Sequence, residues 1–313
     1  MSYAASLKGL KKAELKTALQ KLIYPKKVLD YGSGYQHTWW GFWYTDRDPQ
    51  TNECINRYSS KRFYFSKTNT SKALSGMNIE HSFPKSWWGG ASNNAYKDLY
   101  NLYPSDTEGN TAKGNFPMGV VTKVKTEDKG YDKVGTGTIN GSVQQCWEPG
   151  DVYKGDFARG YMYMAVAYGK FTWVKTGLQT MSNESYPGLK SWASSLYSQW
   201  SQDDKVDELE RTRNDAVSKI QGNRNLFVDY PYLCEYLWGD SVNVPFNPYT
   251  SLTTATDDYR YMGVPTGIEQ VPASDTFRES MIYNLQGRAM GTSRTNLPKG
   301  VYIRRGKKFV VEH

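Results

Sequence analysis

Three residues in one stretch of the chain have side chains suited to metal-assisted hydrolysis. Glu80 and His81 are neighbours, and Asn110 follows them farther along the chain. Carboxylate and amide oxygens are ligands for a hard divalent cation, which leaves other positions open for water and phosphate. A neutral imidazole can take a proton from an attacking water, and a reference pKa of about 6.5 keeps most histidine neutral at neutral pH. These groups therefore predict hydrolysis of phosphodiester bonds.

Two strands are expected to position the first of these groups. A short strand carries Glu80 and His81 and ends at Pro84. Adjacent side chains of a strand point to opposite faces, so the backbone must twist or leave the strand for both to serve one site. The run over residues 98–103 alternates aspartate, tyrosine and leucine and predicts a second strand. Pro104 should end this strand because proline has no N–H to donate to a ladder.

A helix is predicted directly after the second strand. Ser105 and Glu108 match the capping box, in which the serine caps a backbone amide and the glutamate reaches back to the cap. Asn110 then falls in the second turn after Gly109, a pair that costs a helix about 1–1.5 kcal/mol relative to alanines. Local rules broken in this way often mark a functional site. The segment thus predicts a ββα unit with one imidazole, one carboxylate and one amide oxygen directed inward.

The composition indicates a polyanionic partner. A net charge of +8 over 313 residues attracts nucleic acid or an anionic surface. The aromatic content of 15% suits a tyrosine-rich core, nucleobase stacking or sugar stacking, and we expect the core use to dominate. Trp87 and Trp88 are likewise expected to pack inside the fold. His37 is expected to have a packing or surface role, because no acidic or histidine partner lies at ligand spacing.

The cysteines and the apolar runs limit the class of protein further. Cys54, Cys146 and Cys234 are widely spaced and form no CxxC pair, which argues against a structural zinc site. One disulfide with one free thiol remains open in an oxidising compartment. No apolar run approaches the roughly 18 residues that a membrane span requires. The N-terminus lacks the apolar stretch of a signal peptide, and we expect a mature domain whose export signal has been removed.

The remaining pattern predicts an α+β protein. Apolar residues at helical spacing predict helices over residues 5–23, 156–168 and 206–221, the last two as core helices with solvated faces. Residues 30–70 are rich in glycine, aspartate and aromatics and predict irregular loops with short strands. Residues 120–150 predict strands joined by glycine turns.

Several blocks of the chain together resemble one known family. The runs EHSFPKSW, DLYNLYPSD and NTAKGN, with GDFARGYMYMAVAY from 155 and VDELERTRNDAVSKIQGNRNLFVDYP from 206, resemble the endonuclease I family of ββα-metal, or His-Me finger, nucleases. The resemblance covers roughly residues 5–240. It implies His81 as general base and Glu80 and Asn110 as ligands of Mg²⁺, with Mn²⁺ or Ca²⁺ as alternatives. It also implies largely sequence-nonspecific cleavage of DNA, and often RNA, to 5′-phosphate ends.

The chain departs from this family at two positions. Lys113 stands where the family usually carries an arginine, and a lysine binds phosphate as a point charge rather than bidentately. Tyr100 stands where several members have a histidine. Asn101 and Asn115, which follow these positions, are expected to support the site.

The residue that binds the product phosphate has four candidates. They are Lys85, Lys113, Arg159 and Arg224. For Arg159 and Arg224 the favoured alternative is a structural role, in a buried pair and in a turn.

The chain divides into three parts, of which the last has two runs, IYNLQGRAMG and VYIRRGKKFVV, that alternate like strands around glycine turns. A catalytic domain over residues 1–244 is followed by a linker over 245–270, rich in proline, threonine and glycine, and by a small β-rich tail over 271–313. The runs YNLQGRAMG and GVYIRRGKKFVV in the tail are similar to sorting-type modules of exported Bacteroidetes proteins. We therefore expect a secreted, periplasmic or cell-surface protein of a bacterium. The alternative is a small β-unit that only packs on the enzyme.

Two hypotheses from other functional classes remain open. A catalytically inactive module that binds nucleic acid or another polyanion would explain the charge, although Glu80, His81 and Asn110 argue against it. A carbohydrate-active protein would use two carboxylates as acid and base, and no such pair stands out in the sequence. No obligate protein partner is evident.

Overall fold

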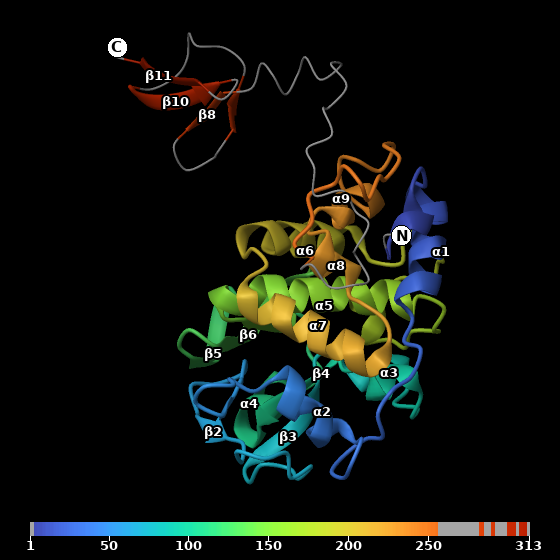
Figure 1. The fold of residues 1–313 in the computed structure, drawn as a ribbon, viewed down its shortest axis with the longest axis vertical. Helices are drawn as coiled ribbons and strands as arrows, with labels where there is room; N and C mark the ends of the chain where they lie inside the picture. Colours follow the sequence, from blue (N-terminus) through green and yellow to red (C-terminus); the bar gives the residue numbers. More distant parts are fainter. Residues whose placement is uncertain (1–2, 256–281, 285–288, 292–298, 305–306, 312–313) are drawn as a thin grey trace. The chain divides into compact units, whose positions relative to one another are not determined.

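The computed structural model divides into two compact units, Met1–Gly263 and Val264–His313. The structure describes residues 3–255, 282–284, 289–291, 299–304 and 307–311 (Figure 1). No helix within these ranges is long and apolar enough to cross a membrane. The division into a catalytic domain, a linker and a tail stays a prediction.

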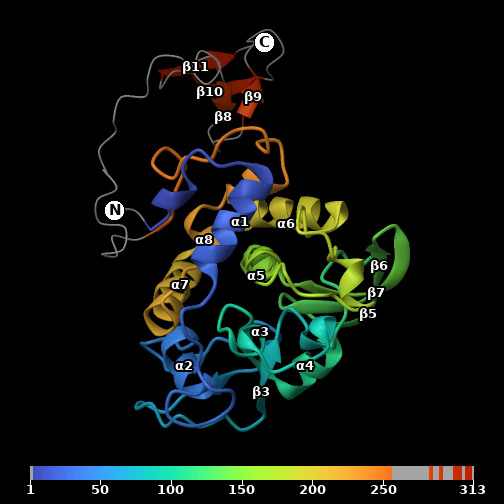
Figure 2. The same cartoon turned by 90° about the vertical axis from the view of Figure 1, so that its right-hand side faces the viewer.

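Helix α5 (Lys154–Ala167) runs through the middle of the first unit. Around it pack α1 (Lys12–Ile23), α6 (Ser191–Asp203) and α8 (Leu226–Asp229), as Figures 1 and 2 show. Every residue of α5 after the first is buried. The predicted helix over 156–168 is thus confirmed, but its predicted solvated face is wrong, because other elements cover the helix on all sides.

Helix α7 (Glu208–Gln221) confirms the predicted helix over residues 206–221. The side chain of Asp207 accepts a hydrogen bond from the backbone N–H of Glu210 and so begins the helix. Gly222 ends it with a φ of 76°, a left-handed conformation in which glycine meets no steric penalty. Local sequence signals therefore determine both ends of this helix.

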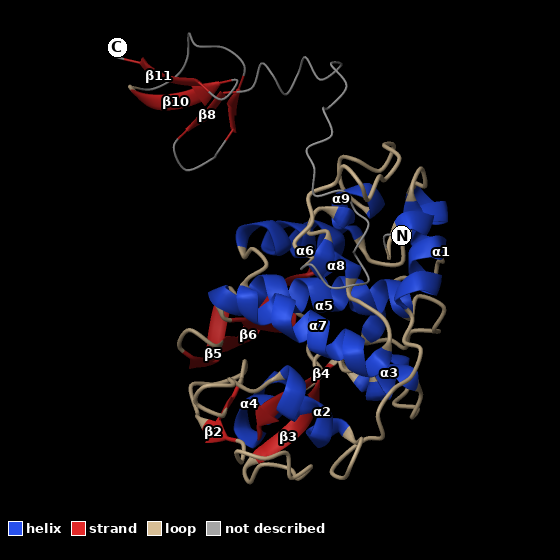
Figure 3. Ribbon diagram, viewed as in Figure 1, coloured by secondary structure: helices blue, strands red, loops and turns tan. Residues whose placement is uncertain are grey.

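The strands lie with several short helices in the other half of the first unit (Figure 3). The strands of this unit pair antiparallel. Strand β1 (Glu53–Cys54) pairs with β2 (Phe63–Tyr64), and β3 (Met77–His81) pairs with β4 (Leu102–Asp106). Strands β5 (Lys123–Asp128), β6 (Asp132–Ile139) and β7 (Ser142–Pro149) form a sheet in that order. The last sheet confirms the strands predicted over residues 120–150. Segregated helices and antiparallel sheets place the fold in the predicted α+β class.

Short helices complete the first unit. They are α2 (Thr38–Thr45), α3 (Asn94–Lys97), α4 (Thr107–Lys113), α9 (Leu233–Leu237) and the 3₁₀ helices η1 (Ala5–Leu7), η2 (Lys85–Trp88), η3 (Asp151–Tyr153) and η4 (Gly177–Gln179).

Helix α2 contradicts the loops and short strands predicted for residues 30–70. Trp39 and Phe42, one helical turn apart, are buried, whereas Trp40, Trp43 and Tyr44 are partly or largely exposed. Aromatic residues on both faces hide the amphipathic pattern from which a helix is predicted. Strands do occur in this region, but they are only the two-residue β1 and β2.

The helix predicted over residues 5–23 is divided in two. The chain forms η1, passes through Gly9 with a φ of 83°, and begins α1 at Lys12. Leu7 and Leu15 are both buried, so the apolar spacing continues across the break. The prediction was wrong there because spacing alone does not detect a glycine in the left-handed conformation.

The second unit is a four-stranded antiparallel sheet in the order β11-β10-β8-β9. Its strands are β8 (Ile282–Asn284), β9 (Ala289–Gly291), β10 (Gly300–Arg304) and β11 (Lys307–Val311). Ile282, Tyr302 and Val311 form its buried cluster. The strands predicted for the two tail segments are confirmed, and a sorting role stays a prediction.

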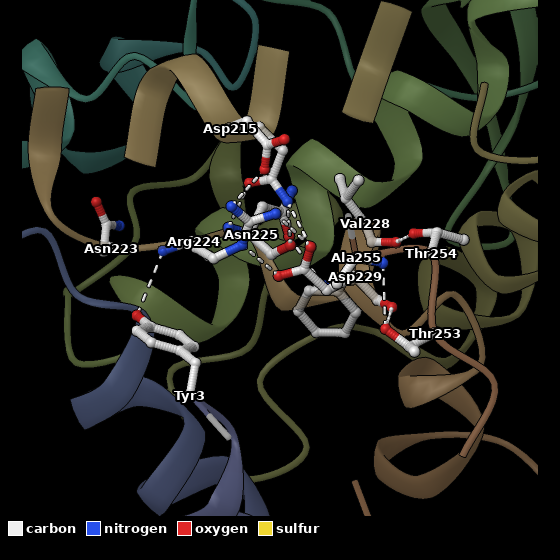
Figure 4. Close-up of polar contacts among 12 residues, drawn as sticks. Tyr3, Asp215, Asn223, Arg224, Asn225, Val228, Asp229, Thr253, Thr254 and Ala255 are labelled. Carbon is white, nitrogen blue, oxygen red and sulfur yellow. Dashed lines mark hydrogen bonds and ion pairs between the residues drawn. The ribbon is translucent and has the colours of Figure 1, made fainter. Parts of the chain in front are cut away.

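The first residues of the predicted linker are folded onto α8 (Figure 4). The hydroxyls of Thr253 and Thr254 donate to the backbone carbonyls of Asp229 and Val228, at 2.8 and 2.6 Å. The carboxylate of Asp229 accepts from Arg224 at 2.8 Å. Up to Ala255, where the continuous description ends, this segment therefore belongs to the first unit, and the rest of the predicted linker lies outside the described residues.

The three cysteines are buried free thiols. Burial raises the pKa of Cys146 and of Cys234 to about 11, and it also raises the pKa of Cys54. Thiols protonated to this degree are poor nucleophiles at neutral pH. The structure therefore contains none of the disulfides that the sequence left open.

A buried carboxylate joins α2 and α7 to strand β4. Asp46, at the end of α2, accepts hydrogen bonds from Arg57 at 2.7 Å and from Arg213 of α7 at 2.9 Å. Arg213 also donates to the carbonyls of Leu99 and Leu102 at 2.8 Å each. Burial would raise the pKa of Asp46, but the two arginines outweigh it and hold the pKa below its usual value. The carboxylate is therefore ionised and paired inside the fold.

We predict that Asp46→Ala lowers the free energy of unfolding by roughly 3–5 kcal/mol, because it removes the carboxylate that two buried guanidinium groups share and leaves Arg57 only its longer contact to Asp156 at 3.5 Å. Urea denaturation followed by circular dichroism measures this. The matched control is Asp151→Ala, which removes an exposed carboxylate paired with Lys154 and should cost less than about 1 kcal/mol. Since the folded pKa of Asp46 is depressed, its contribution is present above about pH 4 and is lost as the pH falls further. Equal losses in the two variants would contradict the prediction.

Candidate active site

Glu80 and His81 are the last two residues of β3 and are both buried. They lie opposite Tyr103 and Leu102 of β4 in an unbroken register. The ladder therefore contains no bulge, and the two side chains reach different neighbours: Glu80 contacts α4, and His81 contacts α3. The expected departure from the strand comes only after His81, where β3 ends.

Glu80 forms a buried ion pair with the last residue of α4. Its Oε1 lies 2.8 Å from Nζ of Lys113, and the two side chains are 9% and 0% exposed. Burial raises the pKa of Glu80, and the charge and hydrogen bond of Lys113 oppose this rise. A buried carboxylate is strongly destabilising when its partner is removed, so Lys113 stabilises the ionised form of Glu80.

His81 is held by a backbone carbonyl. Its Nε2 lies 3.0 Å from the carbonyl oxygen of Tyr96. The ring centroids of Tyr31 and Tyr96 lie 5.6 and 4.5 Å from that of the imidazole. Burial lowers the pKa of His81 to about 4; the Tyr96 carbonyl opposes this shift, and Lys85 and Lys113 add to it. The imidazole is therefore neutral at neutral pH.

Lys85 and Lys113 act electrostatically on both groups. Each lowers the pKa of Glu80 and of His81. The effect of a charge on the pKa of another group weakens as the distance between them grows. The carboxylate and the imidazole thus lie in one electrostatic environment, although they extend toward different helices.

Strand β4 and helix α4 begin later than the sequence predicted. The strand runs over Leu102–Asp106 instead of residues 98–103, and Pro104 lies within it. Asp106, not Ser105, caps the helix: its Oδ1 accepts the N–H of Gly109 at 3.0 Å. The predicted capping box is therefore wrong. Ser105 is buried in the strand, and pairing with β3 prevails over its capping preference.

Asn110 is the fourth residue of α4, one position nearer the start of the helix than predicted. It precedes Lys113 by three positions, and residues at this spacing share one side of a helix. Asn110 is partly buried, and its side-chain amide has no hydrogen bond within the described part of the chain. Because Lys113 contacts Glu80, this side of α4 faces β3.

The two supporting asparagines bind the segment that follows His81. Asn101 accepts the N–H of Phe83 at 2.7 Å and donates to the Phe83 carbonyl at 3.1 Å. The carbonyl of Asn115 accepts from the indole N–H of Trp87 at 3.1 Å, and its side chain donates to Ser86 at 3.3 Å. Both residues therefore fix the path of the chain as it leaves β3. Trp87 is fully buried, as expected for a packing residue.

The candidate phosphate-binding residues differ in burial. Arg159 is fully buried and paired with Glu210 at 2.6 Å, and Arg224 is 1% exposed and paired with Asp229 at 2.7 Å. Neither guanidinium can reach a phosphate without leaving its carboxylate, so both side chains occupy the structural positions that the sequence left as the alternative. Lys85 is exposed, with its Nζ 5.2 Å from the ring of Tyr96.

Tyr31 and Tyr96 were missed by sequence reasoning. Tyr96 acts through its backbone carbonyl, which every residue has, so no side-chain signal could have identified it. Tyr31 contacts His81 only because the chain before α2 folds back on β3. His37, at the start of α2, is partly buried and contacts the Tyr31 carbonyl at 3.2 Å.

The side-chain oxygens of Glu80 and Asn110 would suit a hard cation that keeps most of its water. Within the described residues no group of three or more histidine, cysteine, aspartate or glutamate side chains is arranged to hold a metal. Glu80 and Asn110 would supply two oxygens, and one Glu80 oxygen already contacts Lys113. This small set suits Mg²⁺, which binds proteins through one or two carboxylates and retains several waters.

Comparison with known proteins gives a consistent result. The model of the family described as endonuclease I matches residues 11–232. An extracellular ribonuclease of Bacillus subtilis (strain 168) is 30% identical over 251 residues, which are 76% of this chain and 78% of that protein. An extracellular ribonuclease of Bacillus amyloliquefaciens is 30% identical over 244 residues, again 76% and 78% of the two chains.

A third relative has a different described activity. An extracellular deoxyribonuclease of Aeromonas hydrophila is 26% identical over 140 residues, which are 42% of this chain and 49% of that protein. The family match includes β3, β4 and α4 and most of the helical half of the first unit. The chain therefore belongs to the endonuclease I family and is an endonuclease that acts on nucleic acid.

Proposed function

We propose that this enzyme is a divalent-metal-dependent, largely sequence-nonspecific nuclease of the ββα-metal type, built from β3, β4 and α4. His81 is the general base, and Glu80 and Asn110 are the metal ligands. The hydrogen bond between His81 and the Tyr96 carbonyl is the observation that supports this proposal most strongly.

This hydrogen bond selects the tautomer of His81. A carbonyl oxygen can only accept, so Nε2 carries the hydrogen and Nδ1 keeps its lone pair. The surrounding Tyr31 and Tyr96 rings limit the rotation of the imidazole. Nδ1 of His81 is thus ready to take a proton from water without first losing one of its own.

The residues around Glu80 hold its carboxylate for a cation. Lys113 fixes Oε1, which leaves Oε2 as the oxygen able to bind a metal together with the amide oxygen of Asn110. Mg²⁺, or Mn²⁺ or Ca²⁺ in its place, would stabilise the negative charge that develops on the phosphate.

Contacts to the phosphate backbone explain cleavage without base specificity. Lys85 is the exposed cation beside the proposed base, and a lysine offers a point charge to any phosphate. The relatives are described as ribonucleases and as a deoxyribonuclease, which supports action on both DNA and RNA, with 5′-phosphate ends as the expected products. They are also described as extracellular, which supports secretion of this enzyme.

Replacing His81 tests the general base. We expect His81→Ala to slow the nicking of supercoiled plasmid in Mg²⁺ by about 10²–10⁴-fold, the usual contribution of a general base. His37→Ala, which removes another partly buried histidine, should stay close to wild type. A chelator should stop the wild-type reaction. The proposed mechanism fails if wild type binds plasmid but does not cut it with any divalent cation. It also fails if His81→Ala cuts normally.

Replacing Asn110 tests the cation site. Asn110→Ala should raise the Mg²⁺ concentration that gives half-maximal cleavage by more than about tenfold. Even the loss of a residue that only supports a ligand lowers metal affinity by about 10–100-fold. Asn110→Asp restores an oxygen ligand and serves as the matched control, so it should require far less extra metal. An unchanged Mg²⁺ requirement in Asn110→Ala would remove this residue from the ligand set.

Replacing Lys85 tests the phosphate contact. Lys85→Ala should raise KM for DNA and reduce the slope of log KM against log salt by about 1, because one ionic contact is lost. Lys21→Ala is the control, an exposed lysine in the last turn of α1, a helix that packs on α5. Equal slopes for the Lys85 variant and wild type would exclude a direct phosphate contact.

A further inference from the structure

Helix α2 and the loop before it present a row of exposed aromatic rings. We call Tyr35, Trp40, Tyr44 and Trp43 the aromatic row. Tyr35 and Trp40 lie 5.8 Å apart between ring centroids, Trp40 and Tyr44 4.8 Å, and Tyr44 and Trp43 5.0 Å. Tyr35 is 73% exposed and Tyr44 is 47% exposed. Trp40 and Trp43 are partly buried and pack against the core together with Trp39 and Phe42. Tyr35 and Tyr44 are the rings of the row that the core leaves exposed.

Three rings of the aromatic row form one wall of a groove of about 780 Å³. Tyr35, Trp40 and Tyr44 line one side, and Thr212, Ala216 and Lys219 of α7 line the other. Helices α2 and α7 pack against each other, and both views show them side by side (Figures 1 and 2). The groove therefore has a wall of aromatic rings and a wall of small and polar side chains.

The three carboxylates that line the groove are held in ion pairs. Their cationic partners are Lys97 for Asp30, Arg211 for Glu208 and Arg224 for Asp215, and Arg224 is shared with Asp229.

Two further cations line the same groove. Lys27 and Lys219 are exposed, and neither forms an ion pair within the described parts of the chain. They are therefore available to a polyanion.

Residues of the groove are linked through the chain to the proposed general base. Asp30, which lines the groove, is followed by Tyr31, whose ring stacks on His81 at 5.6 Å with an angle of 18° between the planes. Asp30 also pairs at 3.0 Å with Lys97. Lys97 follows Tyr96, whose carbonyl holds His81. One chain position therefore separates a groove-lining residue from the ring that stacks on His81.

We propose that this groove binds a single-stranded segment of the nucleic acid substrate, with bases stacked on Tyr35 and Tyr44 and phosphates near Lys27 and Lys219. The proposal rests on the proposed nuclease function for its class of ligand. Bases of a duplex stack on one another and cannot reach the rings, whereas unpaired bases of any sequence can stack on an aromatic face. The groove would therefore favour single-stranded DNA and RNA over duplex without selecting sequence.

The test measures binding in the absence of cleavage. The full-length chain carrying His81→Ala is mixed, in chelator, with a fluorescent single-stranded oligonucleotide, with the same backbone made abasic, and with the corresponding duplex. Fluorescence anisotropy gives the three affinities. The same measurements are made after adding Tyr35→Ala and Tyr44→Ala together. The control adds Tyr232→Ala, an exposed tyrosine of the first unit outside the groove.

Stacking predicts a specific loss. The variant with both Tyr35→Ala and Tyr44→Ala, the tyrosine pair variant, should bind the single strand at least about fivefold more weakly, which is the smallest loss expected for one stacked base. Its affinity for the abasic strand and for the duplex should change little. The Tyr232→Ala control should match its parent. Equal affinities of the pair variant and its parent for the single strand would overturn the proposal, as would an equal loss for the abasic strand.

Two other outcomes would assign the groove to a different occupant. Binding of a soluble oligosaccharide that only the tyrosine pair variant loses would make it a sugar site. A self-association of the parent, seen by sedimentation and lost in the pair variant, would make it a contact between copies. Either result overturns the nucleic-acid proposal. Failure of the proposed nuclease function is seen separately, as absence of plasmid cleavage by wild type in Mg²⁺.

Discussion

The buried carboxylate of Asp46 holds the strands of the site against the helices. It accepts from Arg57 and Arg213, and the Arg213 guanidinium lies 4.3 Å from the ring of Tyr103, the β4 residue opposite Glu80. Buried charges are tolerated only when they are paired and hydrogen-bonded, so these groups restrict the arrangement of the chain around them. The position of Glu80 thus depends on a network that contains none of the proposed catalytic residues.

A second buried network sets the chemistry of the site. Lys113 enters the interior to meet Glu80, and His81 enters it to meet a carbonyl. Burial acts in opposite directions on the two pKa values, raising that of the carboxyl group and lowering that of the imidazole, because it disfavours the charged form of each. Lys113 counters this shift for Glu80 and adds to it for His81. One lysine therefore favours both an ionised carboxylate and a neutral imidazole.

Helix α2 serves two surfaces at once. Its inner aromatic residues complete the core, and Gly41 lets the helix approach Leu29 and Leu99 so closely that an added Cβ would lie 2.6 Å from Leu29 Cδ1. Its outer rings form the wall of the groove beside α7. The loop that leads into the helix carries Tyr31 to His81, which connects this surface with the proposed base.

The sequence by itself determined which groups are available for chemistry, and the α+β class with the helices of the later half, because side-chain types, caps and apolar spacing are local properties. It did not determine the start of α4, since pairing between β3 and β4 places Ser105 in a strand and leaves the cap to Asp106. Only the tertiary structure decided that Lys85 is exposed while Arg159 is buried, and that a backbone carbonyl orients His81. Burial and tautomer depend on residues that are distant along the chain and adjacent in space, and no local pattern records that proximity.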